Sequence, residues 1–134
     1  MDILTKFVAA FGLTLVALLG VMWSGWTWRQ KPKRRLHLFL VGITVAFLVV
    51  TIALALELGE SYDLDAAGWI TPIHMSLARA ATASLLLPVV TGVQVLRTGR
   101  VGRAHRAAAL TSFTLIALAA ATGFWMVYQA PALV

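Results

Sequence analysis

The chain has 134 residues, of which 60% are hydrophobic and only 12% are charged, and its mean hydropathy is +0.88. Soluble domains carry about 25% charged residues, and a soluble fold of this size could not bury so much apolar surface. The composition therefore indicates an integral membrane protein. The absence of cysteine excludes disulfides, thiolate metal sites and cysteine nucleophiles.

The net charge of +6 would suit a nucleic-acid-binding protein. However, the basic residues lie beside hydrophobic segments, where lysine and arginine act as topology signals. We therefore expect the lipid bilayer, and no nucleic acid, as the partner of this chain.

Four hydrophobic segments are long enough to cross a bilayer, which needs about 20 helical residues. The first resembles a secretory signal peptide in its position, but its strong positive flank follows the apolar run and no A-x-A-like site ends it, so we expect it to be retained. Trp23 and Trp26 near its end suit the headgroup layer. The predicted helices lie at about residues 3–25, 36–58, 71–97 and 105–128.

The connecting loops alternate in the sign of their charge along the chain. Basic residues crowd the loops at residues 29–35 and 97–106, whereas the loop at residues 60–68 is acidic and follows Glu57 at the end of the second helix. The positive-inside rule then places both basic loops in the cytoplasm, and the acidic loop and both termini outside. We predict a single integral membrane domain over residues 1–134, an up-down-up-down four-helix transmembrane bundle in the cell inner membrane.

Three features of local sequence predict how the helices begin, bend and pack. Pro32 should exclude helix from the first basic loop, and Thr71 is expected to cap the third helix just before Pro72. Pro88 predicts a kink in the middle of the third helix. Small residues at Ser76, Ala80 and Ser84 predict a close contact with the fourth helix. No tandem repeat is evident, although segments two and four each follow an arginine-rich loop that ends in a histidine.

The chain has only three histidines, and two of them share a predicted depth. His37 begins the second helix and His105 precedes the fourth, so both are expected at the cytoplasmic interface. Imidazole is a suitable ligand for haem iron and for metal ions. His37 and His105 are therefore candidate cofactor ligands, the cofactor being haem b or none, and the alternative is that both are simply interfacial residues.

The third histidine belongs to a predicted polar cluster near the outer surface. Glu57 ends the second helix, and His74 and Arg79 lie early in the third. A charge inside a membrane span is costly and calls for a partner. Glu57 is a candidate ion-pair partner for Arg79, and a neighbouring subunit is another. His74 with Glu57 or Met126 is a candidate site for copper or zinc. Alternatively, Arg79 reaches the headgroups and His74 bonds a neighbouring helix.

The sequence contains none of the common catalytic motifs. It has no Walker loop, no GxGxxG, no HExxH and no GxSxG. The acidic loop is too short and exposed to raise a carboxyl pKa by burial, which paired catalytic carboxylates require. We therefore predict that the protein is not an enzyme.

Short motifs in the second half resemble those of a family of small four-helix membrane proteins, the "domain of unknown function 420" family. The matching residues are His74, the run from His105 to Ala109, and the pair Thr122-Gly123, with His37 fitting a further family histidine. The resemblance covers about residues 30–130. The family usually has one more histidine near the outer end of the second helix, where this chain reads ALELGE. The resemblance implies an accessory factor of haem–copper oxidases or other respiratory complexes.

These observations lead to three expectations for function. The first is a non-catalytic accessory protein or small subunit of a respiratory-type membrane complex, which assists haem or metal assembly and binds other membrane subunits. The second is a mono-haem b-type membrane cytochrome that uses His37 and His105. The third is a scaffold subunit of a larger membrane complex with no ligand of its own.

Overall fold

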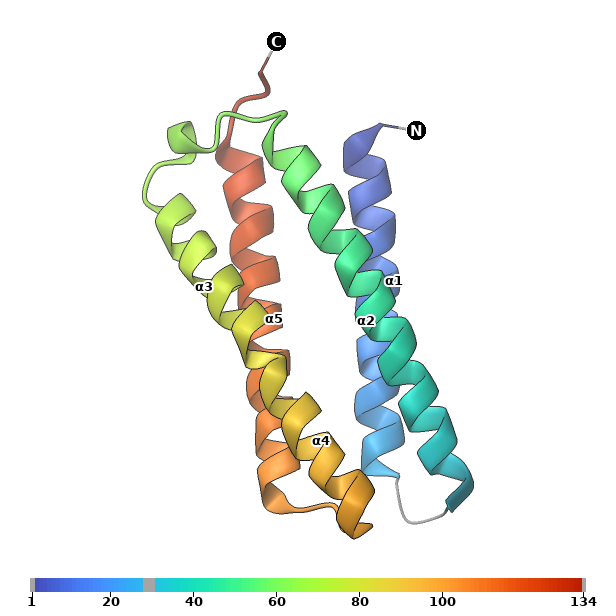
Figure 1. The fold of residues 1–134 in the computed structure, drawn as a ribbon. Coiled ribbons are helices and arrows are strands. Elements are labelled where there is room, and N and C mark those ends of the chain that lie inside the picture. Colours follow the sequence, from blue (N-terminus) through green and yellow to red (C-terminus); the bar gives the residue numbers. More distant parts are fainter. Residues whose placement is uncertain (1, 28–30, 134) are drawn as a thin grey trace. The chain divides into compact units, whose positions relative to one another are not determined.

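The computed structural model describes residues 2–27 and 31–133, and for residues 31–33 it describes only the backbone. Arg29, part of the first predicted basic loop, lies outside this range. The described residues are mostly helical and form no strand beyond one isolated bridge between Tyr62 and Ala132, which confirms the all-α prediction (Figure 1). The helices are α1 (Ile3–Trp26), α2 (Lys31–Gly59), α3 (Ile70–Ser84), α4 (Leu86–Thr98) and α5 (Arg103–Gln129), with a short 3₁₀ turn at Asp65–Ala67.

Four stretches of helix are long and apolar enough to cross a membrane, as predicted. They are Ile3–Trp26, Arg34–Gly59, Ile70–Thr98 and Arg103–Gln129, and the third of them comprises α3 and α4. Their combined apolar surface makes the lipid bilayer the environment of this chain.

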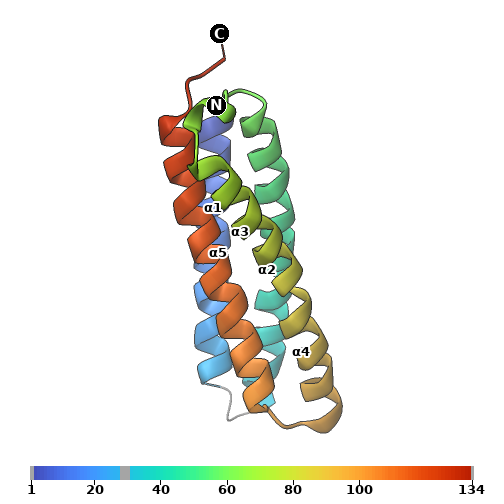
Figure 2. The ribbon, with the colours of Figure 1, turned by 90° about the vertical axis from the view of Figure 1, so that its left-hand side faces the viewer.

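The chain divides into two compact units, Met1–Ser61 and Tyr62–Val134. In the first hairpin, α1 and α2 pack side by side and antiparallel. In the second hairpin, α3 and α4 together run antiparallel to α5 (Figures 1 and 2). Each unit therefore has its own helix–helix seam.

Two predicted helix starts differ from those of the structure. Helix α2 begins at Lys31, so the prediction that Pro32 excludes helix here is wrong. Proline is tolerated in the first helical turn because the N–H that it lacks would have no partner there. Helix α3 begins at Ile70 without a side-chain cap, and the Thr71 hydroxyl instead donates to the Leu64 carbonyl. Thr71 thus ties the preceding loop to α3 rather than capping it.

The predicted interruption of the third span is present at Leu85, between α3 and α4. Pro88 has no N–H to offer the Ser84 carbonyl one turn earlier, so the regular helical ladder is broken at this point. The Ser112 hydroxyl of α5 donates to that Ser84 carbonyl at 2.8 Å. The acceptor that the proline leaves unpaired is therefore satisfied by the neighbouring helix, which also fixes the register of α3 and α4 against α5.

The small-residue seam of the second hairpin differs in part from the predicted one. Ser84 is buried as expected, but Ser76 and Ala80 are exposed, and Ala81 is the residue that lies buried one turn before Ser84. Ser112 lies opposite on α5. The four-residue spacing of small residues predicted the correct helix for the contact, but two of the three predicted residues lie on its exposed face.

The two hairpins share one pattern of seam residues. On α2 the buried residues fall at every seventh position, and on α5 a row of buried and half-buried residues has the same spacing. The first row is His37, Thr44, Thr51 and Leu58, and the second is His105, Ser112, Ala119 and Met126. The opposing helices match too, with Thr14, Ala17 and Ser24 in the first hairpin and Ala81, Ser84 and Thr91 in the second. The chain thus contains a structural repeat that the sequence alone did not reveal.

Candidate functional site

Each of the three histidines lies against a hydroxyl residue and the glycine that follows it on the neighbouring helix of its own hairpin. We call such a pair a hydroxyl–glycine cradle. The cradles are Ser24-Gly25 for His37, Thr91-Gly92 for His105 and Thr122-Gly123 for His74. The same arrangement therefore occurs three times in a chain that has only three histidines.

The first cradle holds His37 at the end of the hairpin where α1 gives way to α2. The Ser24 hydroxyl lies 2.9 Å from His37 Nδ1, and the ring carbon Cε1 would lie 3.4 Å from a Cβ at Gly25. Ser24 is 1% exposed and His37 is 9% exposed, so the pair is enclosed by the two helices. A hydroxyl and an imidazole buried together satisfy each other's hydrogen-bonding needs.

The second cradle repeats this geometry at the equivalent place in the second hairpin. The Thr91 hydroxyl lies 3.0 Å from His105 Nδ1, and Cε1 of His105 would again lie 3.4 Å from a Cβ at Gly92. His105 is half-buried, in the first turn of α5. His37 and His105 consequently occupy equivalent positions in the repeat.

The third cradle lies at the opposite end of the second hairpin and is the tightest. His74 Nδ1 is 3.0 Å from the Ala119 carbonyl and 3.3 Å from the Thr122 hydroxyl. A Cβ at Gly123 would come within 2.8 Å of His74 Cε1, closer than real side chains approach. Only glycine fits at position 123 while the ring stays in place.

The hydrogen bonds assign the tautomer of His74, and the contacts of His37 and His105 are compatible with the same one. The Ala119 carbonyl can only accept, which places the proton of a neutral His74 ring on Nδ1. The hydroxyls of Ser24 and Thr91 can donate to the carbonyls of Val21 and Leu87 while they accept from histidine Nδ1–H. In this tautomer Nε2 carries no proton and is the nitrogen that can bind a metal.

This tautomer is the one that a metal or haem ligand requires. Iron and other transition metals bind the unprotonated nitrogen, while the opposite N–H donates to a hydroxyl or carbonyl that fixes the ring. Among the described residues, Nε2 of His74 and Nε2 of His105 have no hydrogen-bond partner. The cradles thus orient the rings and leave the ligating atoms of these two histidines available.

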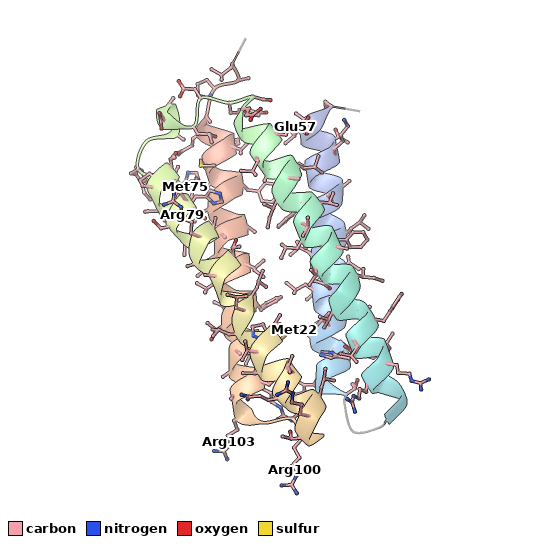
Figure 3. The ribbon with its side chains drawn as sticks, viewed as in Figure 1. Met22, Glu57, Met75, Arg79, Arg100 and Arg103 are labelled. Atoms are coloured by element: carbon pink, nitrogen blue, oxygen red, sulfur yellow. The ribbon has the colours of Figure 1, made fainter. Side chains whose placement is uncertain are left out.

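The pairings predicted across the chain join residues of different hairpins. Glu57 is exposed near the C-terminal end of α2, whereas Arg79 lies on α3 (Figure 3). His74 also belongs to α3. The same division separates His37 from His105. A metal site of His74 with Glu57, an ion pair of Glu57 with Arg79 and a cofactor shared by His37 and His105 therefore stay predictions.

Arg79 is an unpaired cation within its own hairpin. Its side chain is exposed and has no hydrogen bond or ion pair among the described residues of the second unit. It lies about 13 Å along the helix from Ile70, at ~1.5 Å per residue. An arginine at such a depth in a span is expected to meet a carboxylate or to reach headgroups with its long side chain.

The described residues contain no cluster of three or more histidine, aspartate or glutamate side chains arranged to hold a metal ion. Zinc sites usually take three or four protein ligands. Haem needs only one or two axial ligands, since the porphyrin supplies the other four nitrogens. A single imidazole can therefore serve as a haem ligand without such a cluster.

Sequence reasoning identified the histidines but missed Ser24, Thr91 and the three glycines as their partners. The available signal was the dipeptide of a hydroxyl residue followed by glycine, which occurs at the three cradles as Ser24-Gly25, Thr91-Gly92 and Thr122-Gly123, and once more, without a histidine partner, as Thr98-Gly99. Only Thr122-Gly123 was singled out, through the resemblance. Serine, threonine and glycine are common in membrane helices for packing reasons alone, so the dipeptides do not stand out.

Comparisons with known proteins identify no relative of this chain. No family model matches it, and no curated protein or solved structure is significantly similar. The resemblance to the "domain of unknown function 420" family accordingly gains no support. The function has to be argued from the residues and their geometry.

Proposed function

We propose that this chain is a non-catalytic accessory protein or small subunit of a respiratory-type membrane complex, and that it holds haem during assembly of that complex. One observation carries the proposal. In all three histidines Nδ1 lies within hydrogen-bonding distance of a hydroxyl or carbonyl of the neighbouring helix, an arrangement in which Nδ1–H donates and Nε2 would serve as the ligating atom. A merely structural histidine has no need of the same orientation in three places.

Haem is the cofactor that these residues fit best. Haem b would supply one-electron redox chemistry when bound, and this chain would supply the axial imidazoles and their orientation. Ser24 and Thr91 would hold the proton on Nδ1 of His37 and His105, while Gly25 and Gly92 leave space for each ring to lie flat against the helix. His74 would offer a separate ligand at the other end of the second hairpin.

The second candidate is a mono-haem b-type membrane cytochrome that uses His37 and His105 as axial ligands. The specific observation in its favour is that the two histidines occupy equivalent positions in the repeat, each with its own cradle. In this case haem would be bound permanently rather than transferred. A ligand-free scaffold subunit remains the third candidate, which the common tautomer disfavours.

The orientation in the membrane is part of the proposal. The basic loops at residues 29–35 and 97–106 support a cytoplasmic location for one end of each hairpin, with both termini and the acidic loop outside, as in an up-down-up-down bundle. The inner membrane of the cell is the location that this charge pattern and a respiratory partner imply. On this topology His37 and His105 face the cytoplasmic side, and His74 and Arg79 the outer side.

Purification of the whole protein in mild detergent tests the proposal. The expected result is a reduced-minus-oxidised spectrum with haem b bands after haem is added, and loss of these bands when His37 and His105 are both changed to alanine. Haem present in the protein as isolated, without other subunits, would favour the cytochrome. Recovery of other respiratory subunits, with little haem, would favour the accessory protein.

Two results would contradict the proposal. One is the absence of any haem spectrum at saturating haem, and the other is a spectrum that survives replacement of all three histidines. Metal analysis of the same sample checks the alternative site of His74 and Glu57. Copper or zinc that is present in the wild type and absent from His74→Ala would favour a role in metal assembly over a role in haem assembly.

A further inference from the structure

A cavity beside His105 adds a second part to the candidate haem site. It has a volume of about 530 Å³ and lies between the last turns of α4, the connecting loop and the first turn of α5. Its walls include Thr91, Gln94, Thr98, Arg100 and His105, with Val95 as an apolar surface. Pockets for organic ligands measure about 300–1,000 Å³, so this cavity is too large for a single inorganic ion.

The cavity has a coordinating atom among its lining residues. His105 is oriented by Thr91, and its Nε2 has no hydrogen-bond partner among the described residues. The Gln94 side-chain amide likewise has none in the described part of the chain. The lining therefore offers one metal-ligating nitrogen and one uncommitted amide to whatever enters.

The electrostatic surroundings of the cavity favour an anionic ligand. Residues 66–134 contain no aspartate or glutamate, whereas Arg97, Arg100, Arg103 and Arg106 follow one another at this end of the hairpin. Helix α5 also begins without a side-chain cap or an acidic residue in its first turn, so its positive end is unbalanced. Figure 3 shows Arg100 and Arg103 together at the loop end of the hairpin, away from Arg79.

Of these arginines, Arg100 alone is a wall of the cavity. Its guanidinium has no hydrogen bond or ion pair within the described residues. Gly99, with φ of 69°, makes the left-handed turn that ends α4 and leads the chain to Arg100. A guanidinium binds a carboxylate through two parallel hydrogen bonds, which suits an organic acid better than a chloride ion.

We propose that this cavity binds the carboxylate-bearing edge of haem, with Arg100 pairing the propionates and His105 facing the iron. The inference rests on the proposed function, because it names the contacts of the same cofactor. A ligand with both a metal centre and carboxylates would bind His105 Nε2 through the metal and the Arg100 guanidinium through a carboxylate. The hairpin thereby sets the direction in which haem enters, propionates toward the basic loop.

Haem binding by the full-length protein in phosphatidylcholine nanodiscs tests this assignment. The probes are ferric haem b and its dimethyl ester, which has the same macrocycle but no carboxylates. Arg100→Gln should weaken binding of haem b about tenfold, the loss expected for one charge-assisted hydrogen bond. It should leave binding of the dimethyl ester unchanged.

Arg103→Gln is the matched control, since Arg103 lies at the start of the next helix, carries the same charge and is not a wall of the cavity. Equal weakening of haem b by both variants would overturn the inference, because it would show diffuse attraction to the basic loop. Equal weakening of haem b and its ester by Arg100→Gln would overturn it as well. Both variants are checked for helicity by circular dichroism.

The outcome is distinguishable from failure of the proposed function. Wild-type protein that binds no haem, or binds it without any of the histidines, contradicts the function and with it this inference. Histidine-dependent haem binding whose affinity is unchanged by Arg100→Gln contradicts only the cavity assignment. A further outcome concerns phosphatidylglycerol added to the nanodiscs. If this lipid prevents haem binding by the wild type but has no such effect on Arg100→Gln, the cavity would be assigned to a lipid phosphate instead.

Discussion

Replacement of Gly123 by alanine tests the cradle geometry most directly. The new Cβ would lie 2.8 Å from His74 Cε1, whereas carbon atoms pack at about 3.5–4.0 Å, so the ring must move by about 0.7 Å. Such a shift lengthens the 3.0 Å contact of Nδ1 with the Ala119 carbonyl beyond hydrogen-bonding distance. The cradle would then hold the ring without its anchoring hydrogen bond.

The expected loss of stability combines three energy terms. Overpacking costs about 1–3 kcal/mol, and loss of the hydrogen bond costs about 0.5–1.5 kcal/mol. Alanine recovers up to about 1 kcal/mol of helix propensity over glycine. Gly123→Ala should therefore lower the free energy of unfolding by about 1–3 kcal/mol, measured by circular dichroism during denaturation of the detergent-solubilised protein in sodium dodecyl sulfate.

The chain provides two controls for this measurement. Gly92→Ala places its Cβ 3.4 Å from His105, an ordinary contact, and should be neutral or stabilising by up to about 1 kcal/mol through helix propensity. In a His74→Ala background, Gly123→Ala should likewise cost nothing, because no ring remains to be displaced. The reasoning is refuted if Gly123→Ala is as stable as Gly92→Ala, or if its cost is unchanged without the His74 ring.

Two further changes have expected outcomes that depend on single hydrogen bonds. Ser112→Ala leaves the Ser84 carbonyl unpaired and should destabilise the protein by about 1 kcal/mol in the same unfolding assay, a cost that should shrink in a Pro88→Ala background where a backbone N–H is restored. Hydrogen bonds from Thr5 hold the pKa of the Asp2 carboxyl below its usual value. Asp2 therefore stabilises the start of α1 above the pKa of the unfolded chain, and this contribution disappears as the pH falls through the lowered pKa. NMR of the Thr5 amide should report that acid transition in the wild type and none in Asp2→Asn; an unchanged transition in Asp2→Asn would exclude Asp2 as its source.

The membrane spans could be predicted from the sequence because their signal is simple. A run of about 20 apolar residues needs no partner to be recognised, and the effect of Pro88 on its own helix is local. The start of α2 was misplaced because proline disrupts the interior of a helix but not its first turn. Such local rules work when the position within the helix is known.

The seams and the cradles could not be predicted in the same way. In a membrane helix the lipid-facing and protein-facing sides are both apolar, so no contrast marks the buried face. Both seventh-residue rows begin with a histidine, but the row on α2 continues with threonine, threonine and leucine, and the row on α5 with serine, alanine and methionine. The two rows share a spacing but hardly a residue type, which hides the repeat from a reading of composition.

The cradles also bear on proton transfer by the histidines. An imidazole that relays protons takes one up on one nitrogen, releases another from the second, and then returns to its first state. In the cradles Nδ1 lies against a hydroxyl that can donate its own hydrogen to a helix carbonyl, or against a carbonyl itself. Gly123 fits so closely beneath the His74 ring that the ring has little room to turn. A ring that is committed on one side and fixed in place is poorly suited to a proton relay.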